Sequence, residues 1–122
     1  YGVLVNPMVA TGQAHGAMAQ GAGQALLEHA TYDSASGQMV AASFMDYALP
    51  RADDLPSFDL GFNATRCTTN PLGVKGCGEA GAIAAFPAIA NAILDALAPL
   101  GVKSFHGPAT PSRIWQAIQE AR

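Results

Sequence analysis

A glycine-rich segment in the second half of the chain carries the most informative group of reactive side chains. The segment reads NPLGVKGCGEAG from Asn70 to Gly81, and its glycines surround a single lysine and a single glutamate just ahead of a helical pattern. Such loops present free backbone N–H groups, which at a helix start favour an anion or a phosphate-bearing cofactor. The segment therefore predicts a ligand-binding loop, with Glu79 directed into the space that the glycines leave open.

Two roles for Glu79 remain open at this level. A carboxylate beside a bound ligand can serve as a general base. Acidic residues near helix starts are also common because they complement the helix dipole or cap the helix. Nucleotide-binding motifs are excluded, because the segment lacks the GK[ST] ending of a P-loop and GAGQALLE at Gly21–Glu28 does not match GxGxxG.

A row of amides marks a helix expected over residues 11–30, where Thr11 can cap the first turn. Gln13 and Gln20 are seven residues apart and share one helical face. Such a row suits a ligand rich in hydrogen-bonding atoms, although glutamines on an exposed face are often only solvated. Gly16, Gly21 and Gly23 each cost a helix about 1 kcal/mol relative to alanine, which predicts tight packing against another backbone or a bulky ligand there.

The cysteines and histidines form no recognisable metal or redox motif. Cys67 and Cys77 match neither a CxxC pair nor a metal-ligand set, which favours a reducing compartment such as the cytoplasm. Cys77 is a candidate reactive thiol if neighbouring amides lower its pKa. The three histidines are isolated, and we expect them on the surface or packed.

Hydrophobic spacing predicts the elements that hold these residues. Helices are expected at 11–30, from about 80 to 100 with Pro87 at a kink or at the start of a second helix, and from Thr110 onward. We expect Ile83 and Phe86 on the core-facing side of the second helix, and strands at 3–5, 39–47, 57–65 and 102–105. The predicted fold class is α+β, with short, mostly antiparallel strands and two to four packed helices.

Composition limits the possible partners. The chain has 122 residues, of which half are hydrophobic, and a formal net charge of −3, so we expect a single domain over residues 1–122. The absence of basic runs argues against nucleic acid and against an anionic membrane surface. The longest uncharged stretch, Ala80 to Leu94, is shorter than the roughly 20 residues of a membrane span, so no span is expected.

Three segments together carry a family resemblance. They are NPMVATGQAHGAMAQGAGQALLE from Asn6, SFMDYALPRADDLPSF from Ser43 and TNPLGVKGCGEAGAIAAFPAIANAILDAL from Thr69. In this order and spacing they resemble the C-terminal end of the molybdenum-binding large subunit of the xanthine dehydrogenase family. That family also includes aldehyde oxidases, carbon monoxide dehydrogenase and bacterial N-heterocycle hydroxylases. The resemblance covers essentially the whole chain, and LPRADDLPSF is closest to the aldehyde and carbon monoxide dehydrogenase branch.

The resemblance implies roles for residues of the glycine-rich loop and of the first helix. Glu79 matches the general base beside molybdenum, and Gln13 matches the glutamine that contacts the pyranopterin. Four further residues would supply backbone contacts to the cofactor or position the base: Lys75, Gly76, Cys77 and Gly78. Cys77 departs from the family pattern, which more often has valine or another small apolar residue, so packing near the metal is expected to differ while the base is kept.

The resemblance also implies an activity, cofactors and partners. The expected function is oxidation of an aldehyde, an N-heterocycle or a similar small molecule, with water as the source of oxygen. The expected cofactor is a molybdenum pyranopterin, with the cytosine dinucleotide form among the candidates. Electrons would pass to iron–sulfur clusters and FAD on partner domains or subunits, so this chain needs the remainder of the large subunit and is expected to be inactive alone. The alternative is a non-catalytic structural or interaction module that keeps the fold without a cofactor.

Overall fold

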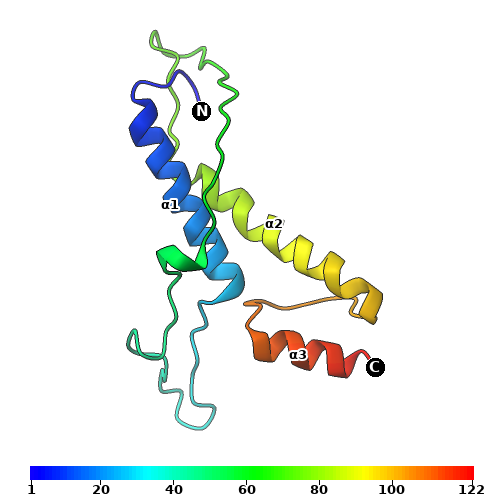
Figure 1. Cartoon of the computed structure of the whole chain (residues 1–122). Coiled ribbons are helices and arrows are strands. Elements are labelled where there is room, and N and C mark those ends of the chain that lie inside the picture. The colour runs from blue at the N-terminus through cyan, green and yellow to red at the C-terminus, as the bar shows by residue number, and fades with distance from the viewer.

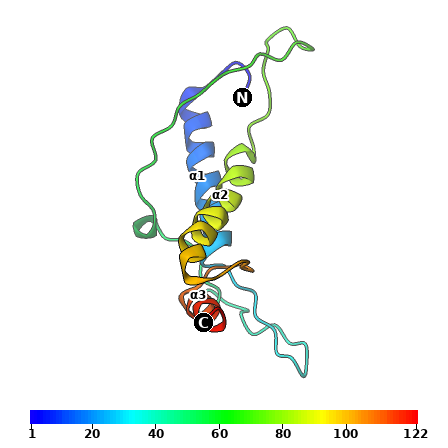
Figure 2. The same cartoon turned by 90° about the vertical axis from the view of Figure 1, so that its right-hand side faces the viewer.

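The regular structure of this chain is entirely helical in the computed structural model, which describes all 122 residues (Figure 1). The elements in chain order are α1 (Pro7–Leu26), the short 3-10 helix η1 (Ala52–Asp54), α2 (Ala80–Leu97), the 3-10 turn η2 (Ala98–Leu100) and α3 (Pro111–Glu120). Helices α1 and α2 lie side by side, and α3 starts near the C-terminal end of α1 and runs below the C-terminal half of α2 (Figures 1 and 2). A long irregular connection joins α1 to α2.

The predicted α+β fold class is wrong, because none of the expected strands forms. The β-type pairing is a single isolated antiparallel bridge between Tyr32 and Met39. Residues 57–65 do alternate in polarity, but a strand exists only where a neighbour supplies a ladder of hydrogen bonds. The segment has one such bond, from the Thr65 N–H to the Tyr1 carbonyl at 3.1 Å. The alternation of polar and apolar residues over 57–65 therefore corresponds to a half-buried extended segment that has no partner strand.

Helix α1 begins four residues before the predicted start. The Asn6 side-chain oxygen accepts a hydrogen bond from the Val9 N–H at 3.2 Å, and Pro7 occupies the first helical turn. Both features are typical of a helix start, because a capping side chain satisfies a free N–H and proline has none to satisfy. Thr11 therefore lies inside the helix and does not cap it.

Small residues make the contact between α1 and α2. The buried stripe of α1 recurs at three- and four-residue intervals and consists of Ala10, Ala14, Ala17, Gly21 and Ala25. A Cβ atom at Gly21 would lie 2.6 Å from the Cβ of Ala85, and one at Gly81 would lie 2.8 Å from the Cβ of Ala17. Neither position has room for a side chain, so the helices approach almost backbone to backbone.

The large apolar residues of α2 are not buried within this chain, contrary to the prediction of a core-facing side. Ile83 is 72% exposed and Phe86 is 40% exposed, and Leu97 is the buried residue of the helix. Pro87 lies within a single helix. The helical run continues through η2 and ends at Gly101, whose backbone has the left-handed conformation. Helix α3 forms where predicted, but its Trp115 is 64% exposed.

The helical run from Ala80 to Leu100 is longer than the uncharged stretch from Ala80 to Leu94, on which the prediction of no membrane span was based. Its 21 residues are apolar and long enough to cross a membrane by length and composition alone. The core helix of a soluble protein satisfies the same criterion, so one such helix is weak evidence for a membrane span.

The chain exposes more surface than a compact protein of its size. Its accessible surface is 8583 Å², whereas a compact monomer of 12.5 kDa exposes about 6,200 Å². The buried residues number 13, and none of them is polar. Much of its apolar surface is therefore exposed.

Candidate active site

Glu79 occupies the position immediately before α2, and its side chain is exposed. The side chain makes no capping hydrogen bond, while the backbone carbonyl of Glu79 accepts the Ile83 N–H at 3.1 Å. The backbone of Glu79 thus takes part in the helix and its carboxylate has no partner. No side-chain cap forms, so the carboxylate is available to a ligand, while its place ahead of the first turn of α2 still complements the helix dipole.

Gln13 lies beside the residue that precedes Glu79. Its Nε2 atom donates a hydrogen bond to the Gly78 carbonyl at 2.5 Å, across 65 positions of sequence. This contact brings together two of the residues that the resemblance had singled out. The Oε1 atom of Gln13 accepts no hydrogen bond within the chain, so this oxygen is free to accept one from a ligand.

The other members of the predicted amide row do not reach the loop. Gln20 is exposed and makes no side-chain hydrogen bond within the chain. A Cβ atom at Gly16 would have no neighbour within 4 Å, so the close approach predicted there is absent from this chain. At Gly23 a Cβ atom would lie 2.9 Å from side-chain atoms of Glu28 and Pro50, so the close neighbours there are side chains. The predicted backbone approach occurs at Gly21, where a Cβ atom would lie 2.9 Å from the Phe86 nitrogen.

Asn70 shapes the glycine-rich loop, and this role was missed in the sequence. Its side-chain Nδ2 donates to the Val74 carbonyl at 3.0 Å, and its Oδ1 accepts the Val74 N–H at 3.1 Å. Between them, Gly73 takes a positive φ of 69° and its carbonyl accepts the N–H groups of Val3 and Cys67. The signal that could have found it is the Asn-Pro pair at the start of the turn, because asparagine side chains readily bond nearby backbone.

The remaining predicted loop residues lie together just before α2. A Cβ atom at Gly76 or at Gly78 would have no neighbour within 4 Å, and the Lys75 side chain is exposed. Cys77 is half-buried and lines, with Lys75, a cavity of about 230 Å³ against the residues that precede and begin α1. Of the four residues, Gly78 is the one that contacts Gln13.

The Cys67 thiol, which lies in the same part of the chain, has a hydrogen-bonding neighbour. The Cys67 sulfur lies 3.1 Å from the Thr69 hydroxyl, and hydrogen bonding from the Thr69 side chain and backbone lowers the pKa of Cys67. No group of three or more His, Cys, Asp or Glu side chains comes together in a way that could hold a metal ion.

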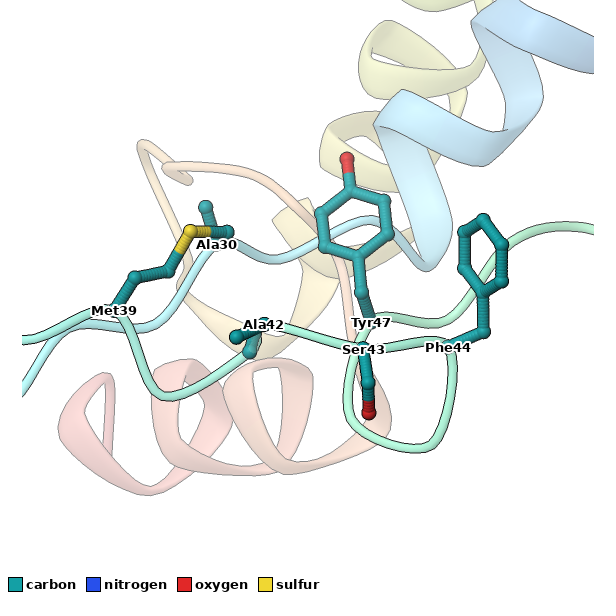
Figure 3. A pocket seen from close by; sticks show the side chains of 7 residues that line it. Ala30, Met39, Ala42, Ser43, Phe44 and Tyr47 are labelled. Carbon is teal, nitrogen blue, oxygen red and sulfur yellow. The ribbon is translucent and has the colours of Figure 1, made fainter.

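A second hollow lies at the opposite end of α1 from the glycine-rich loop (Figure 1). It has a volume of about 590 Å³ and is lined by Ala30, Met39, Ala41, Ala42, Ser43, Phe44 and Tyr47 (Figure 3). The Tyr47 hydroxyl donates to Glu28 at 3.0 Å, and this hydrogen bond raises the pKa of Tyr47. Apart from the hydroxyls of Tyr47 and Ser43 its lining is apolar, so this hollow offers packing surface and no free acid or base.

Comparisons with known proteins identify the family. Residues 1–56 match the model of the molybdopterin cofactor-binding domain. The chain is 40% identical over 118 residues to the nicotine 6-hydroxylase large subunit of Paenarthrobacter nicotinovorans, covering 97% of this chain and 14% of that protein. It is 44% identical over 119 residues to the 6-hydroxypseudooxynicotine dehydrogenase complex subunit gamma of the same organism, covering 97% and 15%.

The similar solved structures come from the same kind of enzyme as the sequence relatives. The chain superposes on quinoline 2-oxidoreductase from Pseudomonas putida 86 with a TM-score of 0.93 and 41% identity, over 99% of this chain and 15% of that one. Over nearly its whole length the chain is homologous to one segment of the molybdenum-binding large subunits of the family that includes xanthine dehydrogenase and carbon monoxide dehydrogenase. The family resemblance seen in the sequence is thereby confirmed. The chain spans about 15% of the length of the relatives that it matches.

Proposed function

We propose that this chain forms part of the active site of a molybdenum hydroxylase and that Glu79 is its general base. The observation that carries the proposal is the state of the Glu79 carboxylate, which is exposed at the start of α2 without a hydrogen bond. A base must reach the proton that it removes, and a carboxylate held by no other group can do so. Homology to the family gives this free carboxylate its expected reaction.

The residues present fit a molybdenum pyranopterin. A pterin offers both donors and acceptors, and the free Oε1 of Gln13 can accept one of its N–H groups. Gly76 and Gly78 leave their backbone uncovered beside that amide, so a planar ligand can approach closely. Gln13 and the backbone of residues 75–78 would hold the cofactor, which supplies the two-electron redox chemistry when bound.

Within this site the protein's own groups bind, orient and move a proton. Glu79 takes the proton of the water-derived nucleophile at a carboxylate oxygen, and the α2 N-terminus beneath it favours a negatively charged group. The substrate class that we propose is an aldehyde, an N-heterocycle or a similar small molecule, and its specificity depends on parts of the subunit beyond this chain. The pterin is proposed in either its simple or its cytosine dinucleotide form.

The activity requires a larger assembly. The exposed apolar surface of α2 and α3 supports packing against the remainder of the large subunit. One relative is a subunit of a dehydrogenase complex by name. We propose iron–sulfur and flavin partners as the electron acceptors and the cytoplasm as the location.

The test compares Glu79→Gln with the wild type in the complete assembly purified under mild conditions. Molybdenum content is measured by elemental analysis, and turnover is measured with a dye acceptor on a panel of xanthine, benzaldehyde, quinoline, nicotine and carbon monoxide. We expect molybdenum content to be unchanged and turnover to fall by at least about 100-fold, because general bases contribute about that much or more.

Glu120→Gln is the matched control, since Glu120 is an exposed carboxylate on α3 that accepts a hydrogen bond from Gln116 at 2.7 Å. It should turn over at the wild-type rate. Unchanged turnover in Glu79→Gln would overturn the catalytic assignment. A wild-type assembly free of molybdenum would overturn the function as a whole and favour the non-catalytic module.

A further inference from the structure

Two contacts with α1 enclose Glu79, one before it and one after it. Before it, the Gly78 carbonyl accepts the hydrogen bond from Gln13 Nε2 at 2.5 Å. After it, Gly81 lies against α1 so closely that a Cβ atom there would be 3.0 Å from the Ala14 carbonyl oxygen and 2.8 Å from the Ala17 Cβ. The backbone of Glu79 is thus fixed at both sides by one face of α1.

The two contacts differ in kind. The one at Gly81 is a steric contact within the α1–α2 interface, and it holds the helix that follows Glu79. The one at Gly78 is a single hydrogen bond, and it holds a loop with few other restraints. Positions 76 and 78 have open space around them, and the nearest backbone hydrogen bond, from the Ala80 N–H to the Cys77 carbonyl, is long at 3.4 Å.

We infer that Gln13 is a positioning residue for the general base, acting through the Gly78 carbonyl. This inference rests on the proposed role of Glu79. The Gly78 carbonyl belongs to the peptide that joins Gly78 to Glu79, so a hydrogen bond to it fixes the plane from which the Glu79 side chain departs. Catalytic rates depend steeply on the position of the reacting groups, and a misplacement of about 1 Å can lower the rate by about 100-fold.

The amide of glutamine suits this role for a chemical reason. A carbonyl oxygen accepts hydrogen bonds only, so its partner must be a donor, and the Nε2 group is one. Glutamate at position 13 has nearly the same shape but presents two acceptor oxygens when ionised. Gln13→Glu therefore removes the donor while it keeps an oxygen that can accept from a pterin N–H.

The experiment uses the complete assembly and three variants, Gln13→Ala, Gln13→Glu and Gln116→Ala. Gln116 is the matched control, because its Nε2 also donates a side-chain hydrogen bond from an exposed helix, to Glu120 on α3. The first measurement is hydrogen–deuterium exchange of the peptides that span residues 74–82. We expect faster exchange in both Gln13 variants and wild-type exchange in Gln116→Ala.

The second measurement is kcat per bound molybdenum, on the panel substrate that the wild type turns over fastest. We expect a fall of about 10- to 100-fold in Gln13→Ala and in Gln13→Glu. We also expect Gln13→Ala to lower the residual rate of Glu79→Gln by less than about twofold, because the positioned group is already absent.

Each failure has its own pattern. If Gln13→Glu keeps wild-type kcat per molybdenum, Gln13 acts as an acceptor toward the cofactor and the positioning role is overturned. If the effects of Gln13→Ala and Glu79→Gln multiply, the two residues act independently, which overturns it as well. If Glu79→Gln itself retains wild-type turnover, the proposed base is wrong and the inference falls with it.

Discussion

The α1–α2 pair and the connection between them are held together by different means. The helices meet through alanine and glycine, and Gly21 and Gly81 each allow a backbone approach that no side chain would permit. The connection over residues 27–79 has no strand and a single short 3-10 helix, and side chains such as Asn70 and Tyr47 hold it through hydrogen bonds. The first region is fixed by shape and the second by individual polar contacts.

The difference explains where the candidate base lies. Glu79 stands at the junction, where the irregular connection ends and the packed helix begins. The packed pair supplies a rigid platform, and the loop supplies free backbone and an unpaired carboxylate. A rigid scaffold that carries a functional loop is a common arrangement of binding and catalytic residues.

The largest expected effect follows from inserting a side chain between the helices. Gly21→Val would place atoms within 2.6 Å of the Ala85 Cβ and 2.9 Å of the Phe86 nitrogen, so the helices must separate. We expect a loss of about 3 kcal/mol in unfolding free energy, or failure to accumulate as folded subunit. Thermal unfolding of the purified large subunit measures it.

Gly16→Ala is the control on the same helix, because nothing lies within 4 Å of its Cβ position. Its unfolding temperature should stay equal or rise slightly, since alanine favours a helix over glycine by about 1 kcal/mol. Equal losses in both variants would show that the helix contact is not set by small residues.

A smaller effect is expected from a polar contact in the connection. Asn70→Ala removes both hydrogen bonds to Val74, which should cost about 1–2 kcal/mol. Exposed Asn91 on α2 makes no side-chain hydrogen bond, so Asn91→Ala should change unfolding by less than about 0.5 kcal/mol. Chemical denaturation of the two variants side by side measures the two changes in unfolding free energy. Equal changes would show that the two Asn70 hydrogen bonds do not stabilise the loop.

The smallest effect concerns pH. The hydrogen bond to Glu28 raises the pKa of Tyr47 above its ordinary value, so the folded state retains the phenol proton more firmly than the unfolded state. The resulting stabilisation is complete below the unfolded-state pKa of about 10 and is lost as pH rises through the higher folded-state value. Absorbance titration should therefore show a late tyrosine step that Tyr47→Phe removes and Glu28→Gln moves to lower pH. A step that stays in place in Glu28→Gln would contradict this cause.

Local patterns allowed part of the fold to be predicted. Apolar spacing indicated α1, α2 and α3, because a helix is stabilised by contacts between residues three and four apart in sequence. The start of α1 was misplaced because Asn6 and Pro7 together resemble the end of an extended segment as well as a helix start. The strands failed because alternation reports only which faces are apolar, and the partner of a strand is not a local property.

The sequence by itself determined the family and the residues to consider, since the segments around Gln13 and Glu79 carry both. Only the tertiary structure decided that these two regions touch, through Gln13 and the Gly78 carbonyl. That contact spans 65 positions and exists because small residues let α1 and α2 approach closely. Spacing along the chain fixes a helix face, but the distance between two helices depends on how their side chains pack against each other.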